Sequence, residues 1–163
     1  MSTKLTLEQE KQIQERIKDA ERNCIAWVLK IMKDHFGDEA YHVLVKTRGE
    51  KICTEWKRKA EEGNDNSIEA LIKHLWEPLK DYGFEYTMEK TESGFQMRCT
   101  KCPEFDFAKR DGITEQMYYM ACESDPYIVE GFNPNIGLTR TKTLMEGDDC
   151  CDHFYYYKNN EQS

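Results

Sequence analysis

The 163-residue sequence has no apolar run long enough to span a membrane, and its first residues lack the hydrophobic core of a secretory signal peptide. It has no basic excess either, since 23 Lys and Arg residues stand against 31 Asp and Glu residues, a net charge of −8. Nucleic acids and anionic membranes are bound by basic surfaces, so neither is expected as a partner. These absences predict a cytoplasmic protein that binds neither nucleic acids nor membranes, and a homo-oligomer is compatible with them.

Internal repeats and low-complexity tracts are also lacking, and the length predicts a single domain over 1–163. The chain does contain seven cysteines, five of them in its last 65 residues. In a reducing cytosol these stay thiols, and their odd number argues against a pure disulfide framework. A thiol can be a nucleophile, a metal ligand, a redox group or simply a small buried residue. The cysteines therefore pose the main functional question.

The first half of the chain has the pattern of helices. Apolar residues recur every three or four positions, which predicts one buried face on a first helix. The residues of this face are Ile13, Ile17, Ala20, Cys24, Trp27, Val28 and Ile31. Thr6 and Gln9 suit a capping box at the start of this helix, and Gly37 ends it. Asp38 is expected to cap a second helix and Asn66 a third.

The second half changes to the alternating pattern of strands. The predicted strands are 84–88, 95–99, 138–144 and 153–158, with a helix at 114–122 and a loop rich in Pro, Gly and Asn at 125–134. The predicted organisation is mainly helical over 1–81, hairpins plus a helix over 82–158, and a polar tail over 159–163. This is an α+β fold with N-terminal helices packed on an antiparallel sheet of about four strands.

Cys102 is the first candidate for chemistry. It ends a predicted strand and precedes Pro103, a favoured first residue of a helix. The positive end of a helix dipole lowers the pKa of a nearby thiol, so Cys102 is predicted to be a thiolate nucleophile. The alternative is a cysteine that only packs at the helix start.

A zinc site is the second interpretation of the same residues. Cys99 and Cys102 have the spacing of half a structural site, and Cys122 and Cys151 would have to supply the other half. Cys150 and Cys151 are adjacent, so in a strand at most one of them faces a given site.

Three further side chains belong with these thiols. Asp125, three residues after Cys122, is a candidate general base if the two share a helix face, and otherwise the start of a turn. His153 alternates with Cys151 on the last strand, so the pair shares a face and suits a nucleophile and its base. Arg140 is a carboxylate clamp if it points inward, and part of a solvated face if it points outward.

The order of these motifs resembles the L-2-amino-thiazoline-4-carboxylic acid hydrolase family and, more distantly, small-molecule-binding domains of the 4-vinyl reductase type. The resemblance covers 80–158 best. The residues that match the family pattern are Cys102, Cys122, Asp125, Arg140, Gly147, Cys151 and Asp152. His153 departs from the pattern because an aromatic residue is expected there, and Cys150 is an additional thiol.

The resemblance implies a hydrolase that opens a small cyclic amidine at a carbon–nitrogen bond, without a cofactor. Cys102, Cys122, Asp125 and His153 are then the candidate catalytic residues. The candidate substrate-binding residues are Arg140, Cys151 and Asp152. The alternative is a non-catalytic binding or sensor domain, with zinc held by Cys99, Cys102, Cys122 and Cys151.

Overall fold

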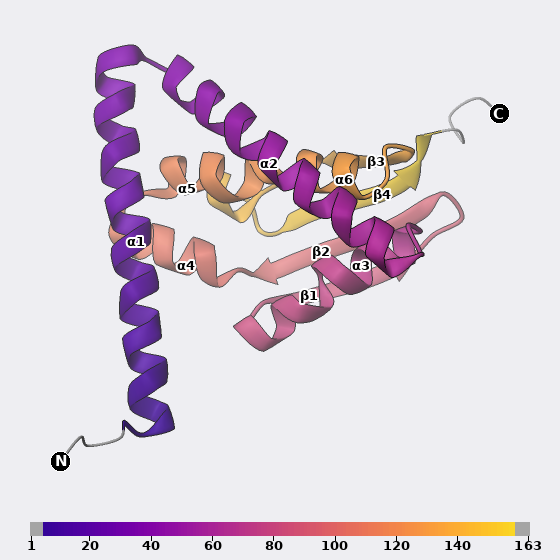
Figure 1. Ribbon diagram of the computed structural model, residues 1–163, viewed down its shortest axis with the longest axis horizontal. Coiled ribbons are helices and arrows are strands. Elements are labelled where there is room, and N and C mark those ends of the chain that lie inside the picture. The colour runs from indigo at the N-terminus through magenta and orange to yellow at the C-terminus, as the bar shows by residue number, and fades with distance from the viewer. Residues whose placement is uncertain (1–4, 159–163) are drawn as a thin grey trace.

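The computed structural model describes residues 5–158, so the predicted tail at 159–163 lies outside the described residues. The chain forms an antiparallel four-stranded sheet preceded by helices (Figure 1), which confirms the predicted α+β fold. The helices are α1 (Leu7–Phe36), α2 (Glu39–Gly63), α3 (Ile68–Leu75), α4 (Pro103–Asp111), α5 (Thr114–Ala121) and α6 (Asp125–Phe132). The short 3-10 helices are η1 (Glu77–Tyr82), η2 (Cys122–Ser124) and η3 (Leu144–Glu146). The strands are β1 (Glu85–Lys90), β2 (Gly94–Lys101), β3 (Ile136–Arg140) and β4 (Cys151–Tyr157).

Helix α1 begins and ends where the sequence predicts. The Thr6 side chain accepts a hydrogen bond from the Gln9 amide while the Gln9 side chain accepts one from the Thr6 amide, and Gly37 ends the helix with a φ of 70°. The prediction for its buried face is wrong. The described part of the protein buries Ala26 and Leu29 of α1, whereas the predicted face is exposed to solvent. Figure 1 shows why: α1 runs along one edge of the molecule, with the other elements on one side of it.

Two of the predicted helix caps are also wrong. Asp38 precedes α2 but makes no side-chain cap, and the cap of α3 is Ser67 rather than Asn66. The Ser67 side chain accepts a hydrogen bond from the Ala70 amide, three residues on. The helix signal therefore identified the element correctly, and its start was misplaced by one residue.

The strand order β1-β2-β4-β3 places β4 between β2 and β3, and every pair is antiparallel. One face of this sheet is covered by α2, α3 and α6 (Figure 1). The core between them includes Trp56, Leu71, Val129 and Phe132 from the helices and Phe95, Met97, Ile136 and Tyr155 from the strands. This covered face is also the face that carries the candidate site.

The largest error in the second half is the predicted loop at 125–134. Asp125–Phe132 is helix α6, because Pro126 lies in the first turn, where a missing amide proton costs no helical hydrogen bond. The third strand is shorter than predicted and ends at Arg140, while the fourth begins two residues earlier, at Cys151. Both corrections matter for the site, since Asp125 becomes a helix residue and Cys151 a strand residue.

Candidate functional site

Three elements bring the central side chains of the site together. Arg140 and His153 are direct partners in the β3–β4 pairing, so their side chains leave the sheet side by side. Cys151, His153 and Tyr155 alternate on β4 and are all buried against the helices. Asp125, the first residue of α6, meets this face of the sheet.

Asp125 joins the other two side chains. Its Oδ2 accepts a hydrogen bond from Arg140 Nη1 at 2.6 Å and lies 3.0 Å from His153 Nε2. Arg140 Nη1 also donates to the carbonyl oxygen of Cys122 at 2.8 Å, and Nη2 lies 3.5 Å from both Tyr118 Oη and Glu123 Oε1. Arg140 thus points inward, with 11% of its side chain exposed. Burial works to lower the pKa of Arg140, but the Asp125 carboxylate together with Cys122 and Tyr118 outweighs it and leaves that pKa raised.

His153 has one nitrogen bound and one free. Nε2 faces the Asp125 carboxylate, whereas Nδ1 is buried and has no hydrogen-bond partner within residues 5–158. A carboxylate accepts but does not donate, so the neutral ring carries its proton on Nε2 and a lone pair on Nδ1; this tautomer is assigned from the hydrogen bond. A buried nitrogen with an unused lone pair is the feature expected of a general base held in position by a carboxylate.

Aromatic side chains hold the His153 ring. The Trp76 ring contacts it edge-on with centroids 5.1 Å apart, and the Tyr155 ring stacks at 6.4 Å. Trp76 Nε1 donates a hydrogen bond of 3.1 Å to Tyr155 Oη, which joins the two walls. The imidazole therefore has little freedom to rotate away from Asp125.

The predicted position of Cys102 is confirmed, but its predicted pKa shift has the wrong direction. Cys102 is the N-cap of α4 and precedes Pro103. Burial raises the pKa of Cys102 to about 11, although the Phe105 and Glu104 amides work to lower it. Desolvation of the thiolate therefore outweighs the helix terminus, and the resting residue is a protonated thiol.

The other thiols of this region are protonated for the same reason. Burial raises the pKa of Cys99 to about 12, and burial also raises the pKa values of Cys122 and Cys151. Cys102 and Cys151 both contribute to the raised pKa values of Cys99 and Cys122, and Cys99 pairs directly with Cys151 across β2 and β4. Within residues 5–158, no three His, Cys, Asp or Glu side chains are arranged to hold a metal ion. The zinc alternative stays a prediction that metal analysis would test.

Asp152 points away from this group, and Cys150 makes a contact of its own. Asp152 alternates with His153 on β4, so its side chain leaves the opposite face of the sheet. It accepts hydrogen bonds from the amides of Thr141 and Lys142 and from the Thr141 hydroxyl, at 2.6–2.8 Å. Cys150 is buried and accepts a hydrogen bond from Arg98 Nη1. These contacts give Asp152 a structural role in the turn after β3, and its predicted contact with substrate stays a prediction.

Sequence reasoning missed Trp76 and Glu123. Trp76 lies just after α3, far along the chain from β4, and only the packing of that region on the sheet brings it to His153. Glu123 could have been found from Arg140, because a buried arginine needs acidic groups around it and Glu123 is close to Asp125 in the chain.

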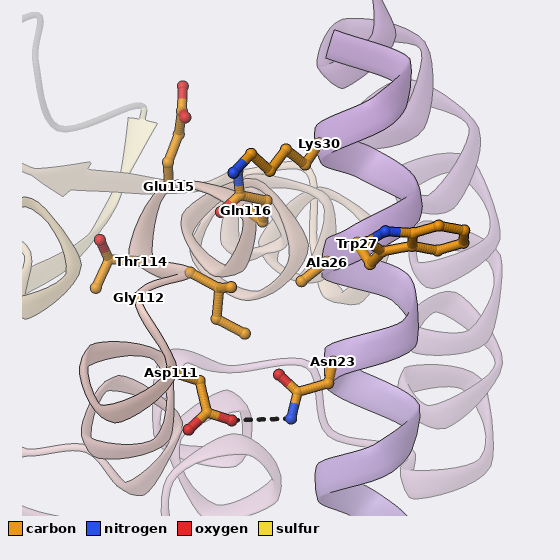
Figure 2. Close-up of a pocket in the computed structure, with 10 residues that line it drawn as sticks. Asn23, Ala26, Trp27, Lys30, Asp111, Gly112, Thr114, Glu115 and Gln116 are labelled. Atoms are coloured by element: carbon orange, nitrogen blue, oxygen red, sulfur yellow. Dashed lines mark hydrogen bonds between the residues drawn. The ribbon is translucent and has the colours of Figure 1, made fainter. Parts of the chain in front are cut away.

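A surface hollow of about 460 Å³ lies elsewhere, between α1 and the α4–α5 junction (Figure 2). Its polar residues include Asn23, Lys30 and Asp111, and Asn23 Nδ2 donates a hydrogen bond of 2.8 Å to Asp111 across it. Neither Asp125, Arg140 nor His153 lines this hollow. The candidate site is therefore the buried cluster on the sheet, and the hollow is a separate feature of the surface.

A sequence profile of L-2-amino-thiazoline-4-carboxylic acid hydrolases matches residues 8–155 of the chain. The chain belongs to this family. The match runs from the start of α1 into β4, so it includes the helical half as well as the strands that carry the site. The family name indicates a hydrolase. A search of curated proteins found no match. Over the described residues 5–158, this family member has no helix that is both long and apolar enough to cross a bilayer.

Proposed function

We propose that the protein hydrolyses a carbon–nitrogen bond of a small cyclic amidine related to 2-aminothiazoline-4-carboxylate. The family membership supports the substrate class. The observation that carries the proposal is the buried His153 ring, with Nε2 bound to Asp125 and Nδ1 without a partner in the described residues.

His153 Nδ1 takes a proton from water as the oxygen forms a bond to the electrophilic amidine carbon. Asp125 stabilises the imidazolium that results and keeps the ring in orientation, as carboxylate partners of catalytic histidines do. The imidazolium then returns its proton to the ring nitrogen. As the carbon–nitrogen bond breaks and the carbonyl forms, the hydroxyl proton of the intermediate passes through the same imidazole to the departing amine. Water is the more suitable nucleophile here, because burial keeps Cys102 and Cys122 protonated at neutral pH.

The charges of the site suit a substrate that carries both signs. An amidine becomes a cation on protonation, and the substrate class named by the family also has a carboxylate. Arg140 can pair with that carboxylate in a bidentate fashion, while Asp125 and Glu123 can pair with the amidinium. In the absence of substrate, Arg140 and Asp125 pair with each other. On binding, the substrate carboxylate would take the place of Asp125 beside Arg140, and the amidinium would take the place of Arg140 beside Asp125.

The test is turnover of 2-aminothiazoline-4-carboxylate by the wild type and by His153→Gln. A glutamine amide can still donate to Asp125 in place of Nε2, but it offers no base in place of Nδ1. The variant should lose a factor of about 10²–10⁴ in kcat with little change in thermal stability. The matched control is His42→Gln on the exposed side of α2, which should keep full activity.

Product chemistry tests the bond that breaks. Cleavage of the ring carbon–nitrogen bond releases an amine, whereas cleavage of the ring carbon–sulfur bond releases a thiol. Release of thiol alone would refute the assignment of the bond. Binding of the substrate without any turnover would instead favour the non-catalytic binding domain, and undiminished activity of His153→Gln would remove His153 from the mechanism.

A further inference from the structure

Helix α1 presents an apolar face that nothing in the described protein covers. The exposed apolar side chains include Ile13 at 40%, Ile17 at 46%, Trp27 at 64% and Ile31 at 39% of their surface. Such residues are expected in a core, and a continuous exposed row of them marks an interaction surface. We propose that α1 pairs with α1 of a second copy of this chain as a parallel two-stranded coiled coil.

The spacing of this row is that of a coiled-coil seam. Successive members are separated by four, three, four, three and four residues, which is the heptad pattern of a and d positions. The members are Ile13, Ile17, Ala20, Cys24, Trp27 and Ile31. Ile17 and Ile31 occupy a positions, where β-branched residues favour two strands in parallel.

The seam lies on the side of α1 opposite its contacts with α4 and α5, with Trp27 at the rim of the hollow between them. The side of α1 that contacts the body includes Ala26 and Leu29, which are buried. It also includes Asp19, Arg22 and Lys33, which form ion pairs with residues of α4 and α5. At 100° per residue, this side lies about 160° around the helix from the seam. Figure 1 shows α1 at the edge of the molecule, and Figure 2 shows the Trp27 ring projecting away from α4 and α5. A second helix can therefore reach the seam without displacing the body.

The first half of α1 also needs a partner for stability. Every residue of 7–18 is exposed, so three turns of helix receive almost no support from a core. Helices of that length are marginal in water by themselves, because nucleation is unfavourable and few side-chain contacts offset it. Pairing along Ile13 and Ile17 would supply the missing apolar contact.

Flanking charges select the parallel orientation. In a parallel pair, Arg16 at a g position lies beside Glu21 at the e position of the second copy, and the contact occurs twice. An antiparallel pair with the same seam would place Glu21 beside Glu21 of the second copy and Arg16 beside Lys30. Neither Arg16 nor Glu21 forms an ion pair within residues 5–158. Their charges are therefore free to act between copies, attracting in one orientation and repelling in the other.

Sedimentation of the purified full-length protein tests the pairing. The wild type should sediment as a dimer at micromolar concentration. Ile17→Glu and Ile31→Glu should each raise the dimer dissociation constant by about 100-fold or more, since each places two charges in the seam. The matched control is Ile25→Glu, the same change at a position that is 41% exposed but off the seam, and it should leave the dimer intact.

Oxidation of the wild type tests the orientation. In a parallel pair the two Cys24 thiols meet in one layer, so copper phenanthroline should join them, the oxidant taking the two electrons while two protons are released. In an antiparallel pair Cys24 faces Ala20 instead. Cys24 is an exposed free cysteine, and Cys24→Ser should abolish the cross-link.

Three results would overturn the proposal. One is a wild type that stays monomeric over the micromolar range. A monomer that instead binds lipid vesicles through α1 would count as the same result. Another is a dimer that Ile17→Glu and Ile31→Glu leave intact. The third is a dimer that forms no Cys24 cross-link. Helical content and Tm of each variant identify any that fail to fold, and the cross-link of the unmodified protein needs no variant at all.

Discussion

The ion pair between Asp125 and Arg140 allows a quantitative test of the site. Asp125→Asn leaves the Arg140 side chain, 11% exposed, without its main carboxylate partner. Removing one member of a buried pair costs about 3–5 kcal/mol, because the remaining charge stays desolvated. Glu123 at 3.5 Å and the Cys122 carbonyl at 2.8 Å still face Arg140 and compensate in part. We therefore expect Asp125→Asn to lower the free energy of unfolding by about 2–3 kcal/mol.

The coupling between the two residues is measured by a double-mutant cycle in urea, followed by circular dichroism. Arg140→Met should also be destabilising, since it leaves Asp125 beside Glu123 without a cation. The double variant removes both charges, so its loss should be about 1–2 kcal/mol smaller than the sum of the single losses. Glu123→Gln is the matched control, and its longer, more exposed contact should contribute under about 1 kcal/mol. Losses that add to within about 0.5 kcal/mol would refute the ion pair as a coupled unit.

Two predictions concern burial. The pKa of Cys102 is about 11 in the folded protein, against an ordinary value of 9.0. Between these two pH values the folded protein keeps a proton that the unfolded chain has lost. Cys102 should thus leave the free energy of unfolding unchanged below pH 9 and lower it by up to about 1 kcal/mol per pH unit between pH 9 and 11. At pH 8, Cys102 should react with iodoacetamide far more slowly than the exposed Cys24. Equal rates would contradict its burial. Gly131→Ala would place a Cβ against the Cys53 carbonyl oxygen, so urea denaturation should show a free energy of unfolding lower by about 3 kcal/mol or more. The control is Gly63→Ala, whose Cβ would have its nearest contact at 3.7 Å, and its stability should be unchanged or slightly raised.

The sequence by itself determined the local elements. The capping box of Thr6 and Gln9, the helix end at Gly37 and the alternation of Phe95, Met97 and Cys99 are all found as predicted. Each of these features depends on residues within one helical turn or one strand, so the signal and the structure lie in the same few residues. The order of motifs in the second half indicated the family, because each motif is also a short run of neighbouring residues.

Only the tertiary structure decided which surfaces meet. The apolar row of α1 has the periodicity of a buried face, yet it is exposed, because periodicity specifies a face and not the element that covers it. Likewise a helix start predicted a low pKa for Cys102, but neighbours from other elements bury the thiol and raise that pKa.

The arrangement of the candidate site was likewise decided only by the tertiary structure. Asp125, Arg140 and His153 were each recognisable in the sequence as candidates, but their alternatives stayed open because residue type does not fix orientation. The pairing of β3 with β4 and the start of α6 place them within hydrogen-bond distance of one another. Trp76 came from an element whose sequence carried no sign of the site, because its contact with His153 arises from packing between segments distant in the chain.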